Sequence, residues 1–205
     1  MRIIDLEQGS SEWLKFKAGK VSGTSLAQAV GTPRVQETLL NRLIAERMTE
    51  VVNIEINSEA VQRGTALEPV ALNAMRDKTS LPFETVGMIA PDYEGFAVSP
   101  DAILKEGSEI VSGLEIKCPD SKKHIEYLRA GIIPKEYRHQ VLSPFLCSKS
   151  ITSWHFASFD DRNYELPLFT TVINRADVED EIAEIQRKLA SFLDLLDKEY
   201  FNLTF

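Results

Sequence analysis

Two apolar segments joined by a short polar turn constrain the fold of this chain more than any other feature. Residues 96–104 are mostly apolar, residues 105–108 are polar and include a glycine, and residues 109–117 form a second apolar segment. This pattern predicts a β-hairpin. Paired residues of a symmetric hairpin have numbers with a constant sum, and the numbers of Asp101 and Glu115 average to 108, at the turn. We therefore expect these two carboxylates to lie nearly opposite each other on neighbouring strands.

Side chains alternate along a strand, so Glu115 and Lys117 are expected on one face, with Ile116 directed into a core. Asp101, Glu115 and Lys117 then converge on one small volume. Paired carboxylates suit a hard divalent cation such as Mg²⁺, which takes about six oxygen ligands and retains several waters. The alternative is an ordinary ion pair between Lys117 and either acid, which contributes at most ~1 kcal/mol on an exposed sheet.

The residues around these carboxylates resemble a known nuclease signature. Its first part is Ser99-Pro100-Asp101, and its second part is Leu114-Glu115-Ile116-Lys117-Cys118-Pro119. Together they are similar to the PD-(D/E)xK motif in the form carried by lambda-exonuclease-like viral recombination exonucleases. The resemblance implies an α/β fold with a restriction-endonuclease-like core, in which helices flank a central mixed β-sheet. The length of 205 residues favours one domain, so residues 1–205 are expected to form a single nuclease domain.

Composition limits the classes of protein to consider. A net charge of −8 argues against a protein that coats DNA non-specifically, since such proteins carry basic patches. Two cysteines are too few for a disulfide framework or a four-thiolate cluster. The apolar runs are too short to span a membrane, and the N-terminus lacks a signal-peptide pattern. We therefore expect a cytoplasmic protein without a membrane partner.

The N-terminal region combines hydroxyl groups with basic residues. A helix is expected through Trp13, ended by Gly19, and a second one from Ser22 to about Gly31. Hydroxyls and free amides at a helix start, beside Lys17 and Lys20, favour either a phosphate site or ordinary capping. The resemblance implies a 5′-phosphate and DNA-binding set: Lys17, Ser22, Thr24, Arg34, Ser99 and Val61.

Three members of this set need comment. Lys17 stands where the family has an arginine, and a lysine cannot form the bidentate fork with a phosphate, so weaker end recognition is expected. Thr24 stands where the family has a serine. Val61 matches the family's apolar strand-separating wedge, although core packing explains a valine there equally well.

Helical periodicity predicts two long helices before the hairpin. Thr32-Pro33 is a strong helix start, and Asn57-Ser58 is expected to begin the next helix. Pro69 should bend or break that second helix near Glu68. Glu68 would otherwise be a solvated helix residue, but the resemblance places it at the site, where it orients Lys117 or a water at the metal.

The remaining elements follow from similar signals. Residues 82–90 read as a strand, a helix should run from Asp120 or Ser121 to Arg129, and Pro134 should start another helix. Gln140 falls on the apolar side of that last helix, so it is either a satisfied core residue or a site residue. The resemblance implies that Gln140 supports the catalytic centre, although the tyrosine expected shortly after it is absent. Two strands, a core that includes Trp154, Phe156 and Tyr164, and a final helix over residues 177–200 complete the prediction.

The interpretation of the site is a metal-dependent deoxyribonuclease. Asp101 would bridge two Mg²⁺ ions about 3.5–4 Å apart, with Glu115 and the Ile116 carbonyl completing one of them, and Mn²⁺ fits the same ligands. Lys117 would stabilise or help to deprotonate the attacking water.

The resemblance further implies a 5′-to-3′ exonuclease acting on linear double-stranded DNA, a ring-shaped homotrimer, and a phage single-strand annealing protein as partner. The alternatives are an endonuclease or junction resolvase of the same fold, which would lack the phosphate pocket, and a catalytically inactive DNA-end-binding protein.

Overall fold

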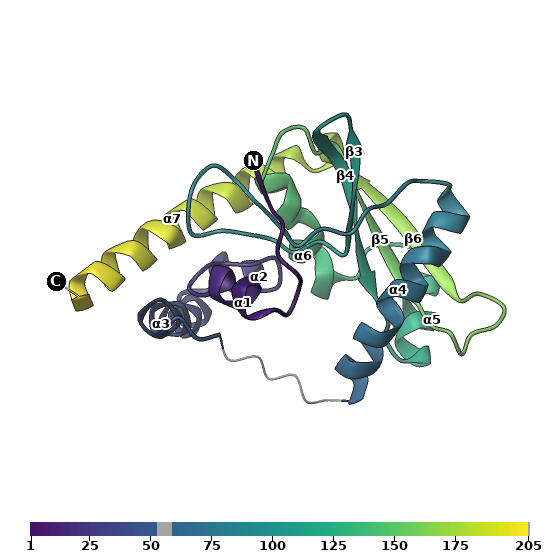
Figure 1. Ribbon diagram of the computed structural model, residues 1–205, viewed down its shortest axis with the longest axis horizontal. Helices are drawn as coiled ribbons and strands as arrows, with labels where there is room; N and C mark the ends of the chain where they lie inside the picture. Colours follow the sequence, from purple (N-terminus) through teal and green to yellow (C-terminus); the bar gives the residue numbers. More distant parts are fainter. Residues whose placement is uncertain (53–58, 205) are drawn as a thin grey trace.

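A four-stranded mixed sheet forms the centre of the molecule (Figure 1). The computed structural model describes residues 1–52 and 59–204. The strand order is β3-β4-β5-β6, and the strands are β3 (Ala102–Glu106), β4 (Glu109–Lys117), β5 (Ser153–Phe159) and β6 (Leu168–Asn174). The pair β4 and β5 is parallel, and the other two pairs are antiparallel. A second, two-stranded sheet joins β1 (Arg2–Ile4) to β2 (Met88–Ala90).

The hairpin of β3 and β4 has the predicted register near the carboxylates. Ala102 pairs with Leu114 and Leu104 with Ser112, so the pair numbers have the predicted constant sum, and the register shifts by one residue only beyond Leu104. Gly107 lies in the turn at φ 61°, a left-handed conformation that a glycine adopts without strain. The glycine in the turn and the alternating apolar side chains along the strands therefore favour the register that places Asp101 beside Glu115.

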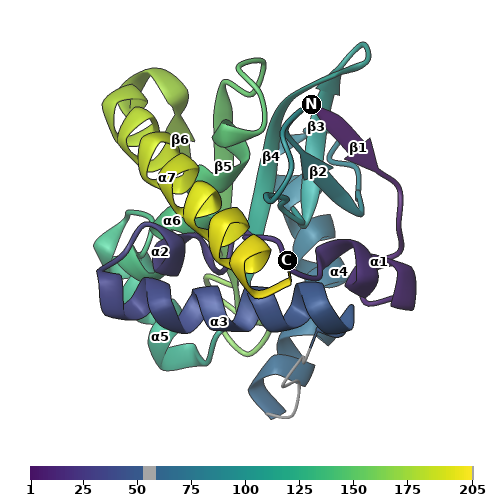
Figure 2. The same ribbon diagram turned by 90° about the vertical axis from the view of Figure 1, so that its left-hand side faces the viewer.

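Helices cover both faces of the sheet. The helical segments are α1 (Ser11–Lys17), α2 (Leu26–Ala29), α3 (Pro33–Thr49), α4 (Glu59–Thr79), α5 (Ser121–Ala130), α6 (Arg138–Leu142) and α7 (Glu179–Thr204), with short 3₁₀ turns at Lys135–Tyr137, Ser143–Leu146 and Arg175–Asp177. Residues of α4 pack against Leu114 and Ile116 of β4. Residues of α2, α3, α6 and α7 share the larger core with Trp154 and Phe156 of β5, on the other face. Figure 2 shows α3 crossing beneath the C-terminal part of α7.

Cap chemistry confirms several predicted boundaries. Helix α3 begins at Pro33 after the cap residue Thr32. The Asp120 side chain accepts a hydrogen bond from the Lys123 amide at the start of α5, and Gly131 ends that helix in the left-handed conformation. The expected helix start at Asn57-Ser58 lies outside the described residues.

Other local predictions were wrong, and tertiary context explains each. The cap of α2 is Ser25 rather than Ser22, and the helix has only four residues. A strand was expected over residues 82–90. The structure has only an isolated bridge at Glu84 and a continuous strand over β2. Pro69 was expected to bend or break the next helix; α4 is not broken there, and its C-terminal half is held by the core that contains Ala71 and Met75.

The residues after Pro134 form two 3₁₀ turns and the short helix α6 rather than one helix. Tyr164 is 93% exposed in the loop between β5 and β6, whereas Trp154 and Phe156 are fully buried as predicted. Within the ranges that the structure describes, none of the helices combines the length and the apolar character needed to cross a bilayer.

Candidate active site

Asp101 and Glu115 lie side by side at the end of the β3–β4 ribbon. The backbone N–H of Ile116 donates to Asp101 Oδ2 at 2.5 Å, which fixes the Asp101 carboxylate against the strand that carries Glu115. The Glu115 side chain is buried, at 4% exposure. Ile116 is directed into the core beneath α4, as the alternation of side chains predicts. The two carboxylates therefore share one face of the sheet.

Lys117 and Gln140 complete this cluster. Lys117 Nζ and Gln140 Nε2 each lie 2.5 Å from Glu115 Oε1, so one carboxylate oxygen receives both donors. The Lys117 ammonium also lies 5.2 Å from the centroid of the Tyr137 ring, a cation–π contact. Tyr137 is stacked on Phe156 with ring centroids 5.8 Å apart, which holds the aromatic surface under Lys117 in place.

The charges of this cluster are not balanced. Burial and the neighbouring charge of Glu115 raise the pKa of Asp101 well above its usual value, although Lys117 and the Ile116 amide oppose that rise. Burial also raises the pKa of Glu115, against the attraction of Lys117 and Gln140. Although burial opposes it, the attraction of Glu115 and Asp101 raises the pKa of Lys117 above its ordinary value. Two buried carboxylates thus share a single ammonium group.

Glu68 approaches the cluster from α4. Burial raises the pKa of Glu68, with Lys117 lowering it and Glu115 raising it, so both of those charges act on this carboxyl. Its own charge in turn acts on Asp101. Asp101, Glu115, Lys117, Gln140 and Glu68, all chosen from the sequence, are therefore gathered in one place.

The residues present fit a divalent cation of the magnesium type. Among the described residues, no three histidine, cysteine, aspartate or glutamate side chains are grouped as a metal-binding set. Mg²⁺ does not need such a set, because it usually binds one or two carboxylates and fills its remaining positions with waters and substrate phosphates. Two desolvated carboxylates with raised pKa values and one shared counter-charge are a donor set that a cation would stabilise.

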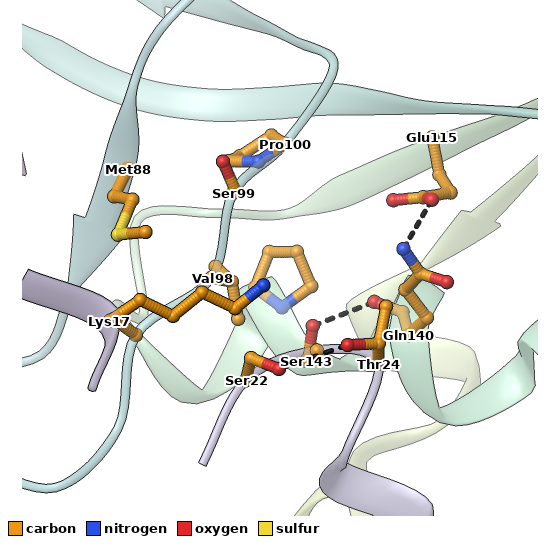
Figure 3. A pocket seen from close by; sticks show the side chains of 13 residues that line it. Lys17, Ser22, Thr24, Met88, Val98, Ser99, Pro100, Glu115, Gln140 and Ser143 are labelled. Atoms are coloured by element: carbon orange, nitrogen blue, oxygen red, sulfur yellow. Dashed lines mark hydrogen bonds between the residues drawn. The ribbon is translucent and has the colours of Figure 1, made fainter. Parts of the chain in front are cut away.

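A small pocket adjoins the Glu115 carboxylate (Figure 3). It has a volume of about 40 Å³ and is lined by residues from the N-terminal region and from the catalytic cluster, including Lys17, Ser22, Thr24, Ser99, Glu115 and Gln140. This volume has room for a small group such as a phosphate. The Lys17 side chain extends along the pocket in Figure 3, and its ammonium lies 4.6 Å from the centroid of the Trp13 ring. Burial lowers the pKa of Lys17.

The hydroxyl groups that line the pocket differ in whether their protons are already used in hydrogen bonds to other groups. The Ser99 hydroxyl donates to the Gly87 carbonyl at 2.6 Å and accepts from Trp13 Nε1 at 3.3 Å. Its proton is therefore engaged, and Ser99 holds the Trp13 ring in place. The hydroxyls of Ser22 and Thr24 lie 3.0 Å apart, and Thr24 is exposed.

Other basic and apolar candidates lie outside this pocket. Lys20 Nζ donates to the Phe16 carbonyl at 2.6 Å and does not line the pocket, so the expectation that it stands beside Lys17 at a phosphate site was wrong. Arg34 is exposed in the first turn of α3. Val61 is 46% exposed on α4, which excludes the core explanation for that residue.

Sequence reasoning missed two groups around the site. Ser143 lines the pocket, and its hydroxyl donates to the Gln140 carbonyl at 2.7 Å. Arg63 donates to Asp160 and to the Pro119 carbonyl, just after the catalytic strand.

Comparisons with known proteins agree with this geometry. The model of the YqaJ-like viral recombinase domain family matches residues 12–150. The crystal structure of LHK-Exo, an alkaline exonuclease from Laribacter hongkongensis, is 32% identical, with a TM-score of 0.85 over 95% of this chain and 96% of that chain. The complex of LHK-Exo with dAMP gives the same values.

A phage-related exonuclease from Haemophilus somnus 129PT is 14% identical, with a TM-score of 0.60 over 88% of this chain and 96% of that chain, which shows a shared fold. A search of curated protein sequences found no match. The matched family domain covers most of the chain, and the sheet that carries its paired carboxylates has the expected mixed order. The chain belongs to the YqaJ-like viral recombinase family of nucleases and has their PD-(D/E)xK-type α/β fold.

Proposed function

We propose that this protein is a Mg²⁺-dependent 5′-to-3′ exonuclease that degrades one strand of linear double-stranded DNA from 5′-phosphorylated ends. The 3′ single-stranded overhangs that remain would serve phage recombination by strand annealing. The observation that carries this proposal is the pair of adjacent carboxylates, Asp101 and Glu115, whose pKa values are raised, with Glu115 lining a pocket that Lys17 also lines. Membership of a family that includes an alkaline exonuclease supports the same reaction class.

Asp101 and Glu115, with the Ile116 carbonyl, are the residues that would hold Mg²⁺, as two ions in the complete site, and Mn²⁺ suits the same oxygen ligands. A divalent cation bound there would offset the negative charge that develops on the phosphate and on its leaving oxygen.

The sequence left two roles open for Lys117, to stabilise the attacking water or to help deprotonate it, and this proposal keeps only the first. Because the carboxylates around it hold its pKa above the ordinary value, Lys117 keeps its proton while they are ionised. It therefore stabilises negative charge on the attacking oxygen and on the phosphate rather than accepting a proton. Gln140 holds the Glu115 carboxylate in place, and Glu68 orients Lys117 from α4.

The pocket beside these residues is suited to the 5′-phosphate. Burial lowers the pKa of Lys17, so a phosphate beside its ammonium would stabilise the protonated form. The hydroxyls of Ser22 and Thr24 supply neutral donors. The pocket is lined by Glu115 as well, so a phosphate bound there stands next to the catalytic cluster. The similar protein LHK-Exo forms a complex with dAMP, a nucleotide with one phosphate.

Arg34 and Val61 would contact DNA outside this pocket, Arg34 through the backbone and Val61 as the apolar wedge between the strands. The resemblance extends the proposal to a ring-shaped homotrimer and to a phage single-strand annealing protein as partner. We also propose that the reaction takes place in the cytoplasm of the bacterial host.

An end-labelled linear duplex incubated with the protein and Mg²⁺ tests this function directly. We expect loss of the 5′-labelled strand from its end, no cleavage of covalently closed circular duplex, and no reaction in EDTA. Nicking of closed circles would contradict the exonuclease assignment and favour an endonuclease of this fold. DNA binding without any cleavage would favour an inactive end-binding protein.

Variants of two lysines that are close in sequence distinguish a contact in the phosphate pocket from a general effect of positive charge on DNA binding. Lys17→Ala should slow digestion of 5′-phosphorylated duplex by about tenfold, because it removes a charge-assisted contact worth about 1.5 kcal/mol. Lys20→Ala removes the same charge, but its ammonium is engaged with the Phe16 carbonyl outside the pocket, so digestion should be unchanged. Equal rates for phosphorylated and unphosphorylated ends in the unmodified protein would contradict a 5′-phosphate pocket.

A further inference from the structure

A second charged cluster lies at the C-terminal ends of β4 and β5. Asp160 is fully buried and accepts from two guanidinium groups, Arg63 Nη2 at 2.9 Å and Arg162 Nε at 2.8 Å. Arg63 Nη2 also donates to the exposed Asp161, at 2.5 Å. Arg63 Nη1 donates to the carbonyl of Pro119, at 3.1 Å, and more weakly to that of Cys118, at 3.4 Å. These carbonyls directly follow the catalytic Lys117. We call Asp160, Arg63 and Arg162 the Asp160 cluster.

Arg63 anchors the half of α4 that otherwise has little packing. In the C-terminal half of that helix, Ala71 and Met75 are completely buried and Leu72 is nearly so. From Glu59 to Glu68, none of the residues whose burial is described is buried. In this first half, Leu67 packs against the edge of the apolar core, and the polar contacts of Arg63 reach the strand end at Lys117.

Glu68 lies between these two anchors, at the weakest place in the helix. Pro69 has no N–H, so the hydrogen bond that position 69 would make to the carbonyl of Thr65 is missing. A helix that lacks one such bond bends easily at that point. Where Glu68 stands relative to Lys117 therefore depends on both anchors, the apolar contacts that begin at Leu67 and the polar contacts of Arg63.

We propose that Arg63 is a positioning residue for the nuclease reaction: by tying α4 to the backbone just after Lys117, it holds Glu68 beside the catalytic cluster. This inference rests on the proposed function, and in particular on the contribution of Glu68. It assigns to Arg63 an effect on turnover that passes through Glu68 rather than through DNA binding.

A double-mutant cycle tests this inference. The variants are Arg63→Ala, Glu68→Gln and the two combined, assayed for kcat and KM on linear duplex with Mg²⁺. Each single change should lower kcat about tenfold, the usual order of effect for a group that orients a catalytic residue, with KM nearly unchanged. The combined variant should be no slower than Glu68→Gln alone, because the effect of Arg63 requires the Glu68 carboxylate.

Arg76→Ala is the matched control. Arg76 belongs to the same helix and donates to the Phe83 carbonyl at 3.0 Å, but it lies in the half of α4 that the apolar core already holds. Its removal should leave kcat unchanged. Arg162 remains as a partner of Asp160 when Arg63 is replaced, so Arg63→Ala should stay folded, which circular dichroism and a melting curve verify. Arg63→Lys keeps the charge and should recover part of the lost kcat.

Each outcome distinguishes this inference from the function on which it rests. Unchanged kcat in Arg63→Ala, or a combined variant whose loss is the product of the two single losses, overturns the positioning role. A change confined to KM would assign Arg63 to DNA binding instead. An unmodified protein that cleaves nothing contradicts the proposed function, and a fully active Glu68→Gln contradicts only the contribution of Glu68, on which the inference depends.

Discussion

Two clusters of carboxylates at the same end of the sheet differ in charge balance. In the Asp160 cluster, the buried carboxylate of Asp160 has two arginine partners, one of which also pairs with the exposed Asp161, so the charges are matched. Although burial opposes ionisation, hydrogen bonds from Ser121 and Arg162 hold the pKa of Asp160 at about 2. In the catalytic cluster, Asp101 and Glu115 share Lys117, and their pKa values are raised.

The difference separates a structural ion cluster from a reactive one. Two guanidinium groups beside Asp160 make that carboxylate a stable anchor for α4 and the β5–β6 loop. Excess negative charge around Asp101 and Glu115 leaves those side chains destabilised until a cation or a proton is supplied. Buried acids alone do not indicate a catalytic site; the shortage of counter-charge does.

The largest expected effect is the loss of catalysis in Asp101→Asn. The amide oxygen can still accept from the Ile116 N–H, so the fold should be kept while the charge that holds the cation is lost. Hydrolysis of end-labelled linear duplex should fall below detection. Asp160→Asn, the same chemical change in the other cluster, should retain measurable turnover. Surviving hydrolysis in Asp101→Asn would remove Asp101 from the metal site.

Lys117→Ala should be nearly as severe. It removes the one ammonium that the two catalytic carboxylates share, and such a charge-stabilising group is worth about 10²–10³-fold in kcat. Single-turnover cleavage under saturating DNA measures the chemical step. Near-normal rates would end the catalytic assignment of Lys117.

Replacing Asp160 and replacing Asp101 should change the free energy of unfolding in opposite directions. Asp160→Asn removes the buried carboxylate that two arginines share and should lower the free energy of unfolding by about 2 kcal/mol. Asp101→Asn removes one of two crowded charges and should raise it by about 1 kcal/mol in EDTA. Urea unfolding at pH 8 without divalent ions measures both. Destabilisation by Asp101→Asn would mean that the catalytic cluster is balanced in the absence of metal.

The pH dependence of the Asp160 contribution should be the smallest of these effects. The pKa of Asp160 is about 2, below its ordinary value of 3.8, so the folded state favours the ionised form. Its contribution is present above the unfolded pKa and is lost as the pH falls towards the folded pKa. The stability difference between the unmodified protein and Asp160→Asn should therefore shrink when urea unfolding is repeated at about pH 3 instead of about pH 6. A difference that grows on acidification would contradict the lowered pKa.

Much of the catalytic cluster was predictable from the sequence because it is local. Asp101 and Glu115 are 14 residues apart on one hairpin, and strand alternation with a constant pairing sum places their side chains together. Glu68 and Gln140 come from distant helices, and only the family resemblance pointed to them.

The Asp160 cluster shows what the sequence left open. Arg63 and Asp160 are 97 positions apart, and no periodic pattern in the sequence around either residue predicts their contact. Tyr164 was misplaced because an aromatic residue beside a strand resembles a core residue, whereas the loop there is held by polar contacts such as that of Asn163 with the Leu166 amide. The broken helix around Gln140 depends on packing against the sheet, which local propensity does not describe.

Calorimetric titration of Mn²⁺ in the absence of DNA tests the central claim most directly. The unmodified protein and Asp160→Asn should both bind Mn²⁺, because the Asp160 carboxylate is already neutralised by its arginines. Asp101→Asn, with its fold verified by circular dichroism, should show no binding. Binding of Mn²⁺ to Asp101→Asn with the affinity of the unmodified protein would contradict the assignment of the paired carboxylates as the metal site.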